Sequence, residues 1–184
     1  MFKIFLFENF NEGRAESREL IKKCASLYDG CAETADFDVE YDDRGKPEFT
    51  NSYLKFSISH SGDVWAAVMG KEKCGLDVQE IRECQFERLA HRFFSDEECI
   101  YVQKQGIEAY FSLWSRREAL GKFTGEGFFM KNRPALVNEQ GVLYNKVEIN
   151  QETVYFHEVF LGSGYDAVWC SCCEDDRAEI VRAE

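Results

Sequence analysis

The chain has 184 residues, of which 45% are hydrophobic, and a formal net charge of -12 at pH 7. This length allows a substantial core in one domain or in two small joined lobes. The acidic balance argues against general nucleic-acid binding, because a phosphate backbone needs a basic surface. No run approaches the roughly 18 apolar residues that span a bilayer, and the start of the chain lacks the features of a secretion signal. We therefore expect a cytoplasmic protein that binds neither membrane nor nucleic acid.

The first forty or so residues predict a strand, a helix and a second strand. The apolar run Phe2 to Phe7 predicts a buried strand, and Arg14 to Tyr28 has the spacing of an amphipathic helix. Asp36 to Tyr41 alternates apolar and acidic residues, as a half-exposed strand does, and Asp42 to Gly45 supplies a turn. We expect one helix packed on a sheet.

A hairpin is predicted next. Phe56 to Ser59 and Val64 to Met69 are strand-like, and the polar residues between them suit a tight turn with His60 at its tip. Cys74 to Ile81 predicts a further strand that contains a single conspicuous acid, Asp77. We expect a second lobe to begin at this strand, which divides the chain into residues 1–71 and 72–184.

The second half predicts two helices followed by strands. Ser95 and Glu98 form a capping-box pattern, and a longer helix is expected from about Gly106 to Phe123, ending at Gly125. Three strand-like runs follow, at Val142 to Ile149, Val154 to Phe160 and Tyr165 to Cys172, before a charged tail from Glu174 that we expect to fray. The predicted class is α+β, with two lobes.

The eight cysteines are scattered, and most lie in segments predicted as helix or strand, which favours reduced thiols. Cys170, Cys172 and Cys173 could form part of a soft-metal site. No second cluster or nearby histidine completes four ligands, so zinc is disfavoured.

Several polar residues allow both a functional and an ordinary interpretation. Strand alternation puts Asp77 and Gln79 on one face, which is either functional or merely solvated. Glu118 and Lys122 share one face of the long helix and form either a common surface pair or a catalytic pair.

The residues in and near the hairpin also allow both a functional and an ordinary interpretation. The hydroxyl of Ser59 and the imidazole of His60 could bind phosphate, or could belong to a plain hairpin. Lys46, after Gly45, is most often a solvated turn lysine. None of these signals is decisive alone.

Their order along the chain is more specific. The series consists of Gly45-Lys46-Pro47, Ser59-His60-Ser61-Gly62, Gly75-Leu76-Asp77-Val78 and the helix motif from Trp114 to Lys122. It resembles the 4'-phosphopantetheinyl transferase superfamily, in its surfactin-synthetase-activator type, from about Met1 through Cys172. The resemblance implies a pseudo-dimer of two similar lobes, each a small, mainly antiparallel sheet packed against helix, with the active site in the cleft between them.

The resemblance also implies a reaction. The 4'-phosphopantetheine arm of coenzyme A passes to a serine of an apo acyl or peptidyl carrier protein, and adenosine 3',5'-bisphosphate leaves. Mg²⁺ would be bound by Asp77 and Glu118, with Lys122 as a further catalytic residue. The coenzyme would contact Lys46, Ser59, His60, Arg18 and Arg117.

One departure from the family pattern affects the metal site. The family's strand motif often reads Asp-x-Glu, whereas this chain has Gln79 at the second position, so a carboxylate is replaced by an amide that ligates weakly or through water. Two other functions remain open: a non-catalytic coenzyme A binding module and a Mg²⁺-dependent pyrophosphohydrolase. We expect a monomer, and the sequence does not indicate which carrier protein is served.

Overall fold

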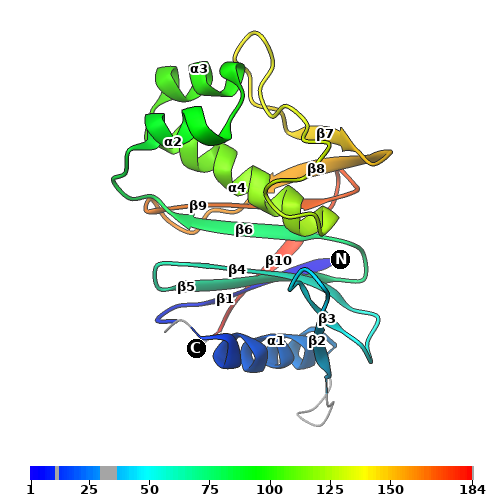
Figure 1. Cartoon of the computed structure of the whole chain (residues 1–184). Coiled ribbons are helices and arrows are strands. Elements are labelled where there is room, and N and C mark those ends of the chain that lie inside the picture. The colour runs from blue at the N-terminus through cyan, green and yellow to red at the C-terminus, as the bar shows by residue number, and fades with distance from the viewer. Residues whose placement is uncertain (11–12, 30–36, 184) are drawn as a thin grey trace.

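The computed structural model describes residues 1–10, 13–29 and 37–183, and its main elements are stacked in layers (Figure 1). In chain order the elements are β1 (Phe2–Phe7), α1 (Arg14–Asp29), β2 (Val39–Tyr41), β3 (Pro47–Phe49), β4 (Lys55–Ser61), β5 (Val64–Gly70), β6 (Gly75–Glu80), α2 (Phe86–Phe93), α3 (Asp96–Gln105), α4 (Ile107–Thr124), β7 (Lys146–Ile149), β8 (Glu152–Glu158), β9 (Tyr165–Ser171) and β10 (Ala178–Ala183). The mixed α+β class predicted from the sequence is confirmed.

The first sheet has the strand order β10-β1-β5-β4, and helix α1 covers its outer face (Figure 1). Apolar side chains of α1, such as Ile21 and Cys24, are fully buried against Phe5, Trp65 and Met69 of the sheet. The predicted first strand and helix are therefore confirmed. Asp36, the expected start of the next strand, lies outside the described residues, as does Cys31, and the described strand β2 is short.

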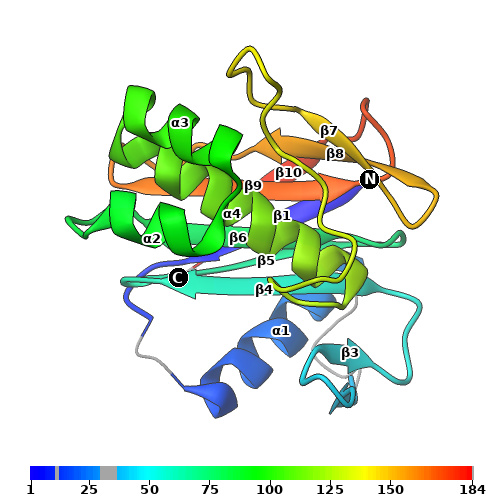
Figure 2. The same ribbon diagram turned by 45° about the horizontal axis from the view of Figure 1, so that its top comes forward.

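The second sheet has the strand order β6-β9-β8-β7, and helix α4 crosses its outer face (Figure 2). Leu113, Leu120 and Phe123 of α4 are fully buried in a core shared with Val154 and Val168 of the sheet. Helix α3 begins with the predicted capping box, and α4 ends at Gly125 in the left-handed conformation. Helix α2, which contacts α3 and α4, was not predicted.

The two sheets face each other across a third apolar core. Alternate residues of β1 and β5, such as Ile4 and Val68, pack there against Leu76, Val78 and Trp169 of the second sheet. Strands that alternate in this way bury one set of side chains under a helix and the other set between the sheets. The order of layers is helix α1, first sheet, second sheet, helix α4 (Figures 1 and 2).

The C-terminal segment differs from the expectation. The tail from Glu174 was predicted to fray, but β10 pairs in parallel with β1 over its whole length, from Phe2 opposite Ala178 to Phe7 opposite Ala183. The prediction was wrong because it rested on the charged residues of the tail. The unpaired edge of β1 offers backbone hydrogen bonds to this segment, and the local sequence does not show that edge. Strand β10 thus belongs to the sheet of residues 2–70, although the expected boundary put it in the second lobe.

Within the described residues, no helix is both long and apolar enough to cross a membrane. The cysteines that the structure describes are free thiols. Cys170 is buried, whereas Cys172 and Cys173 are exposed after the end of β9, so these three side chains do not share one environment.

Candidate active site between helix α4 and strand β6

Asp77 is a buried charge in the middle of β6. Its neighbours Leu76 and Val78 enter the core between the sheets, so alternation turns Asp77 toward α4. The residue is 2% exposed, yet both of its carboxylate oxygens have partners. One oxygen, Oδ1, accepts hydrogen bonds from Ser59 Oγ at 2.8 Å and Lys122 Nζ at 2.6 Å, and Oδ2 accepts from Gln79 Nε2 at 2.7 Å. The carboxylate is thus held in place by both sheets and by α4.

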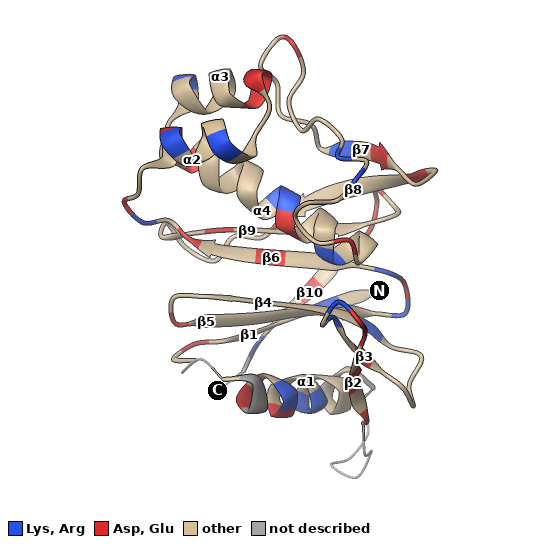
Figure 3. Cartoon of the chain, in the orientation of Figure 1, with Lys and Arg blue, Asp and Glu red and all other residues tan. Residues whose placement is uncertain are grey.

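Glu118 is a half-buried carboxylate one helical turn before Lys122 on α4. Burial raises the pKa of Glu118, the negative charge of Asp77 raises it further, and the ammonium group of Lys122 opposes both effects. Asp77 and Glu118, remote in sequence, therefore share one electrostatic environment. Figure 3 shows the acidic segment of β6 beneath the charged stretch of α4.

The close approach of α4 to β6 depends on Gly75. A β-carbon at Gly75 would overlap the carbonyl oxygen of Ala119 and would lie 2.8 Å from the backbone nitrogen of Phe123. Both obstacles are backbone atoms of α4, so a larger residue can be accommodated only if the helix moves. Gly75 therefore sets the spacing at which helix residues reach Asp77.

We expect Gly75→Ala to lower the free energy of unfolding by about 1–3 kcal/mol, because it displaces α4 from β6. Urea denaturation measures this effect. Gly164→Ala is the matched control, since a β-carbon there meets no atom within 4 Å. Equal stability of the two variants would contradict the assigned spacing.

A row of serine side chains joins the two sheets where strand β4 lies beside β6. Each hydroxyl oxygen accepts a hydrogen bond from a backbone amide of β6, at 2.9–3.1 Å. The pairs are Ser57 with Leu76, Ser59 with Val78 and Ser61 with Glu80. Because the serines alternate along β4, all three face the same edge of the second sheet. Their spacing was visible in the sequence, but their role was not predicted.

Ser59 and His60 point to opposite sides of β4. Ser59 is buried next to Asp77, whereas His60 is exposed and its ring lies 5.4 Å from the ring of Phe10. His60 pairs with Trp65 within the ladder, and the turn itself consists of Gly62 and Asp63. The expectation that His60 occupies the hairpin tip is thus corrected, because β4 extends through Ser61.

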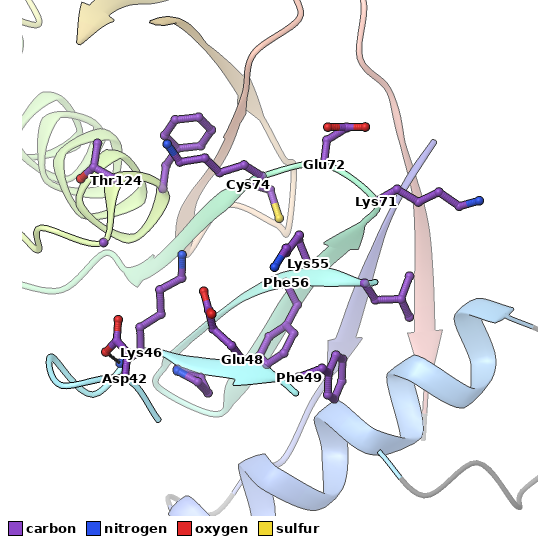
Figure 4. Close-up of a pocket in the computed structure, with 15 residues that line it drawn as sticks. Asp42, Lys46, Glu48, Phe49, Lys55, Phe56, Lys71, Glu72, Cys74 and Thr124 are labelled. Carbon is purple, nitrogen blue, oxygen red and sulfur yellow. Dashed lines mark hydrogen bonds between the residues drawn. The ribbon is translucent and has the colours of Figure 1, made fainter. Parts of the chain in front are cut away.

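Lys46 lines a hollow of about 420 Å³ beside the end of α4 (Figure 4). Asp42 organises the turn before it, since Asp42 Oδ1 accepts hydrogen bonds from the backbone nitrogens of Arg44 and Lys46. The hollow contains four lysines, Lys46, Lys55, Lys71 and Lys73, and three acids, Asp42, Glu48 and Glu72. This local balance contrasts with the net charge of -12 for the chain.

A second hollow, of about 460 Å³, adjoins the first and reaches Lys122. Its walls come from the turn around Lys46, from Phe56, Ser57 and Ile58 of β4, and from the segment that ends α4. Arg44 links the turn to the end of α4, because its Nη1 donates a hydrogen bond to the carbonyl oxygen of Gly125 at 2.9 Å. Lys122, 28% exposed, lies between this hollow and Asp77. The predicted residues Lys46 and Lys122 therefore line one continuous, cation-rich region.

Two predicted coenzyme contacts lie elsewhere. Arg18 is on α1, beyond the first sheet from α4 (Figure 1), and its guanidinium donates a hydrogen bond to the carbonyl oxygen of Val39. Arg117 is 1% exposed, and its guanidinium pairs with Glu98 at 2.5 Å and with the carbonyl oxygen of Pro134 at 2.6 Å. The expectation for Arg117 is corrected, because a buried, paired guanidinium is not available to a ligand.

Asp166 is a nearby acid that sequence reasoning missed. It lies directly opposite Gln79 in the ladder between β9 and β6, so the two side chains share the face beneath α4. Ser115 of α4 donates a hydrogen bond to its carboxylate. Burial raises the pKa of Asp166, and the charge of Asp77 contributes in the same direction. An acid within a strand was the available signal, but its partner across the sheet cannot be read from spacing.

The donors at this site suit a hard cation. Mg²⁺ prefers oxygen ligands, keeps several waters and is commonly bound by one or two carboxylates together with substrate phosphates. Asp77 and Glu118 provide two carboxylates, and Gln79 provides an amide oxygen. In the described part of the chain, no three acidic, histidine or cysteine side chains converge on a metal position. The residues therefore fit an ion that is completed by water and substrate, not a site closed by protein alone.

Comparison with known proteins identifies the family. The family model for the 4'-phosphopantetheinyl transferase superfamily matches residues 73–175, more than half of the chain. This segment contains β6 and α4, and with them Asp77, Glu118 and Lys122. The chain belongs to the 4'-phosphopantetheinyl transferase superfamily.

Individual relatives are similar over part of their length. The chain is 32% identical over 109 residues to the 4'-phosphopantetheinyl transferase psf-1 of Bacillus pumilus, covering 55% of this chain and 46% of the relative. It is 31% identical over 135 residues to the 4'-phosphopantetheinyl transferase HetI of a Nostoc species, covering 67% and 56%, respectively. The 4'-phosphopantetheinyl transferase AcpT of Salmonella typhimurium is 33% identical over 95 residues, covering 48% and 50%. The chain spans about half the length of the curated relatives it matches.

Proposed function

We propose that this protein transfers the 4'-phosphopantetheine arm of coenzyme A to a serine hydroxyl of an apo carrier protein, in a Mg²⁺-dependent reaction that releases adenosine 3',5'-bisphosphate. The single observation that supports it best is the arrangement of Asp77, Glu118 and Lys122 beside a cation-rich hollow, within the segment that matches the family. The proposal includes a monomeric enzyme that acts in the cytoplasm.

Asp77 and Glu118 are the proposed metal ligands, with Gln79 as a weak third ligand or a ligand through water. A Mg²⁺ ion held by these residues would neutralise negative charge on the coenzyme's pyrophosphate. The amide nitrogen of Gln79 already donates to Asp77, so its amide oxygen remains the atom suited to a cation. We expect weaker metal affinity than a third carboxylate at position 79 would give.

Glu118 is the proposed general base. A base works best when its pKa lies near the working pH, and burial together with the charge of Asp77 raises the pKa of Glu118 toward that range. In this role its carboxylate accepts the proton of the attacking serine hydroxyl, directly or through one water. The positive charge of Lys122 opposes this rise in the pKa of Glu118 and so favours the ionised carboxylate, which is the form that accepts the proton.

Lys122 is the proposed anion-binding residue of the reaction. Its ammonium group is partly exposed, bonded to Asp77 and on the wall of the second hollow, so it is within reach of phosphate oxygens placed there. Fixed positive charge near a transferred phosphoryl group stabilises charge that develops in the transition state.

The two adjoining hollows are the proposed coenzyme site. Lys46 lines both of them, and more cations than acids surround each one. A polyanionic coenzyme needs a local excess of positive charge of this kind on a protein whose total charge is negative. His60 remains a proposed phosphate contact. It is exposed on β4, and its side chain lies on the face of the strand opposite to Ser59. Arg18 is a further proposed phosphate contact, although its guanidinium donates a hydrogen bond to the carbonyl oxygen of Val39 on the far side of the first sheet.

Incubating the protein with coenzyme A, Mg²⁺ and a panel of apo carrier proteins, followed by intact-mass analysis of each carrier, tests the proposal. A mass gain of one phosphopantetheine group on at least one carrier is the expected result. Loss of coenzyme A without any modified carrier indicates a pyrophosphohydrolase instead. Coenzyme A that binds and survives indicates a binding module, and either outcome rejects the transferase.

A further inference from the structure

The three serines of β4 form a natural series for comparison. Ser57, Ser59 and Ser61 each accept one hydrogen bond from a backbone amide of β6, so each makes the same kind of bond between the two sheets. A typical bond of this sort contributes modestly to stability. Any difference in function among them must come from what else each hydroxyl contacts.

Within this series, Ser59 is the serine whose hydroxyl contacts two proposed catalytic groups, Asp77 and Lys122. Its hydroxyl donates to Asp77 Oδ1 at 2.8 Å and accepts from Lys122 Nζ at 3.0 Å, in addition to the amide of Val78 at 3.1 Å. A serine hydroxyl offers one donor and two acceptor positions. All of its hydrogen-bonding capacity is therefore used within the protein.

This saturation bears on the role expected for Ser59. The residue is 5% exposed, and a hydroxyl with no spare donor cannot bind a phosphate oxygen without releasing Asp77. The same hydroxyl instead holds one oxygen of Asp77 and the ammonium group of Lys122 in a triangle of short contacts, since Lys122 Nζ lies 2.6 Å from Asp77 Oδ1. The position of both groups thus depends on a strand of the other sheet.

We infer that Ser59 is a positioning residue that fixes Asp77 and Lys122 through the junction of the two sheets, and that it does not bind the phosphates of coenzyme A. This inference rests on the proposed function, because it assigns Asp77 to the metal site of the transfer reaction. Groups that orient metal ligands affect both metal affinity and activity when they are removed.

Ser59→Ala tests the inference, with Ser61→Ala as the matched control. Both variants lose one hydrogen bond to an amide of β6, and Ser61 lies outside both hollows. In Ser59→Ala we expect the dissociation constant for Mg²⁺, measured by calorimetric titration with coenzyme A present, to rise about 10- to 100-fold. We expect kcat to fall about 10-fold or more, while the KM for coenzyme A stays within about 2-fold. Ser61→Ala should retain all three values, and Ser59→Thr, which keeps the hydroxyl, should recover part of the loss.

Three results would overturn the inference. Unchanged Mg²⁺ affinity in Ser59→Ala with weakened binding of coenzyme A, measured without Mg²⁺, would make Ser59 a phosphate ligand. Equal losses in Ser59→Ala and Ser61→Ala would make it a structural residue. A wild-type protein that binds no Mg²⁺ would remove the site itself. If wild type binds Mg²⁺ but modifies no carrier, the proposed function fails while the titrations still decide the role of Ser59.

Discussion

Glu118→Gln is expected to lower kcat for carrier modification by about 100- to 10,000-fold, the contribution of a well-placed general base. Glutamine keeps the size of the side chain but cannot accept the proton of the serine hydroxyl. It also removes one of the two carboxylates proposed to bind the metal. Single-turnover kinetics with a carrier protein measures the effect. An unchanged rate would exclude Glu118 from the mechanism.

The same variant should not unfold more easily in the absence of metal. Burial and Asp77 raise the folded-state pKa of Glu118 above its usual 4.5, so the folded protein binds this proton more tightly than the unfolded chain does. The stability associated with this group is therefore greatest at low pH and falls as pH rises through the interval between the two pKa values. Glutamine removes that loss. Urea denaturation at pH 5 and pH 8 should show that the free energy of unfolding of the variant, relative to wild type, is higher at pH 8 than at pH 5. A variant that is less stable than wild type at pH 8 would contradict the assigned environment of Glu118.

Glu98→Ala is expected to lower the free energy of unfolding by about 3–5 kcal/mol, because it leaves the charge of Arg117 buried without its partner. The Glu98 and Arg117 side chains are each 1% exposed and lie 2.5 Å apart. Glu98 also accepts hydrogen bonds from the backbone nitrogens of Ser95 and Leu136, so the start of α3, the helix α4 and the following loop all converge on it. Burial lowers the pKa of Arg117 to about 10, which still leaves it charged at neutral pH.

The neighbouring residue provides the control for this substitution. Glu97 is exposed and lies in the same first turn of α3, so Glu97→Ala should lower the free energy of unfolding far less than Glu98→Ala does. The double variant Glu98→Leu with Arg117→Met, which removes both charges, should recover much of the loss. Equal stability of the Glu98→Ala and Glu97→Ala variants in urea denaturation would show that the buried pair contributes little.

The local elements could be predicted well because their signals are local. The apolar run of β1, the capping box at Ser95 and the terminating Gly125 each depend on neighbours in sequence, and the structure has all three. Helix α2 and strand β10 were missed for different reasons. The first is short and amphipathic, and the second is a charged segment whose strand conformation depends on pairing with β1.

The site could be predicted only in part. Helical spacing put Glu118 and Lys122 on one face, but their approach to Asp77 requires the close packing that Gly75 permits, which no spacing reveals. Arg117 illustrates the reverse case. Position in the motif suggested a ligand contact, whereas its rotation on α4 turns it into the core beside Glu98. Side chains one residue apart on a helix face different directions, so a motif does not assign one role to all its members.

Calorimetric titration of Mg²⁺ into wild type, Asp77→Asn, Glu118→Gln and the double variant, each with coenzyme A present, tests the central claim most directly. If a single ion is bound jointly by Asp77 of β6 and Glu118 of α4, wild type should bind one Mg²⁺. Each single variant should bind it at least about 10-fold more weakly. In the double variant, the second substitution should weaken binding by less than the first does. Wild-type affinity in either single variant would show that the two carboxylates do not share a metal ion.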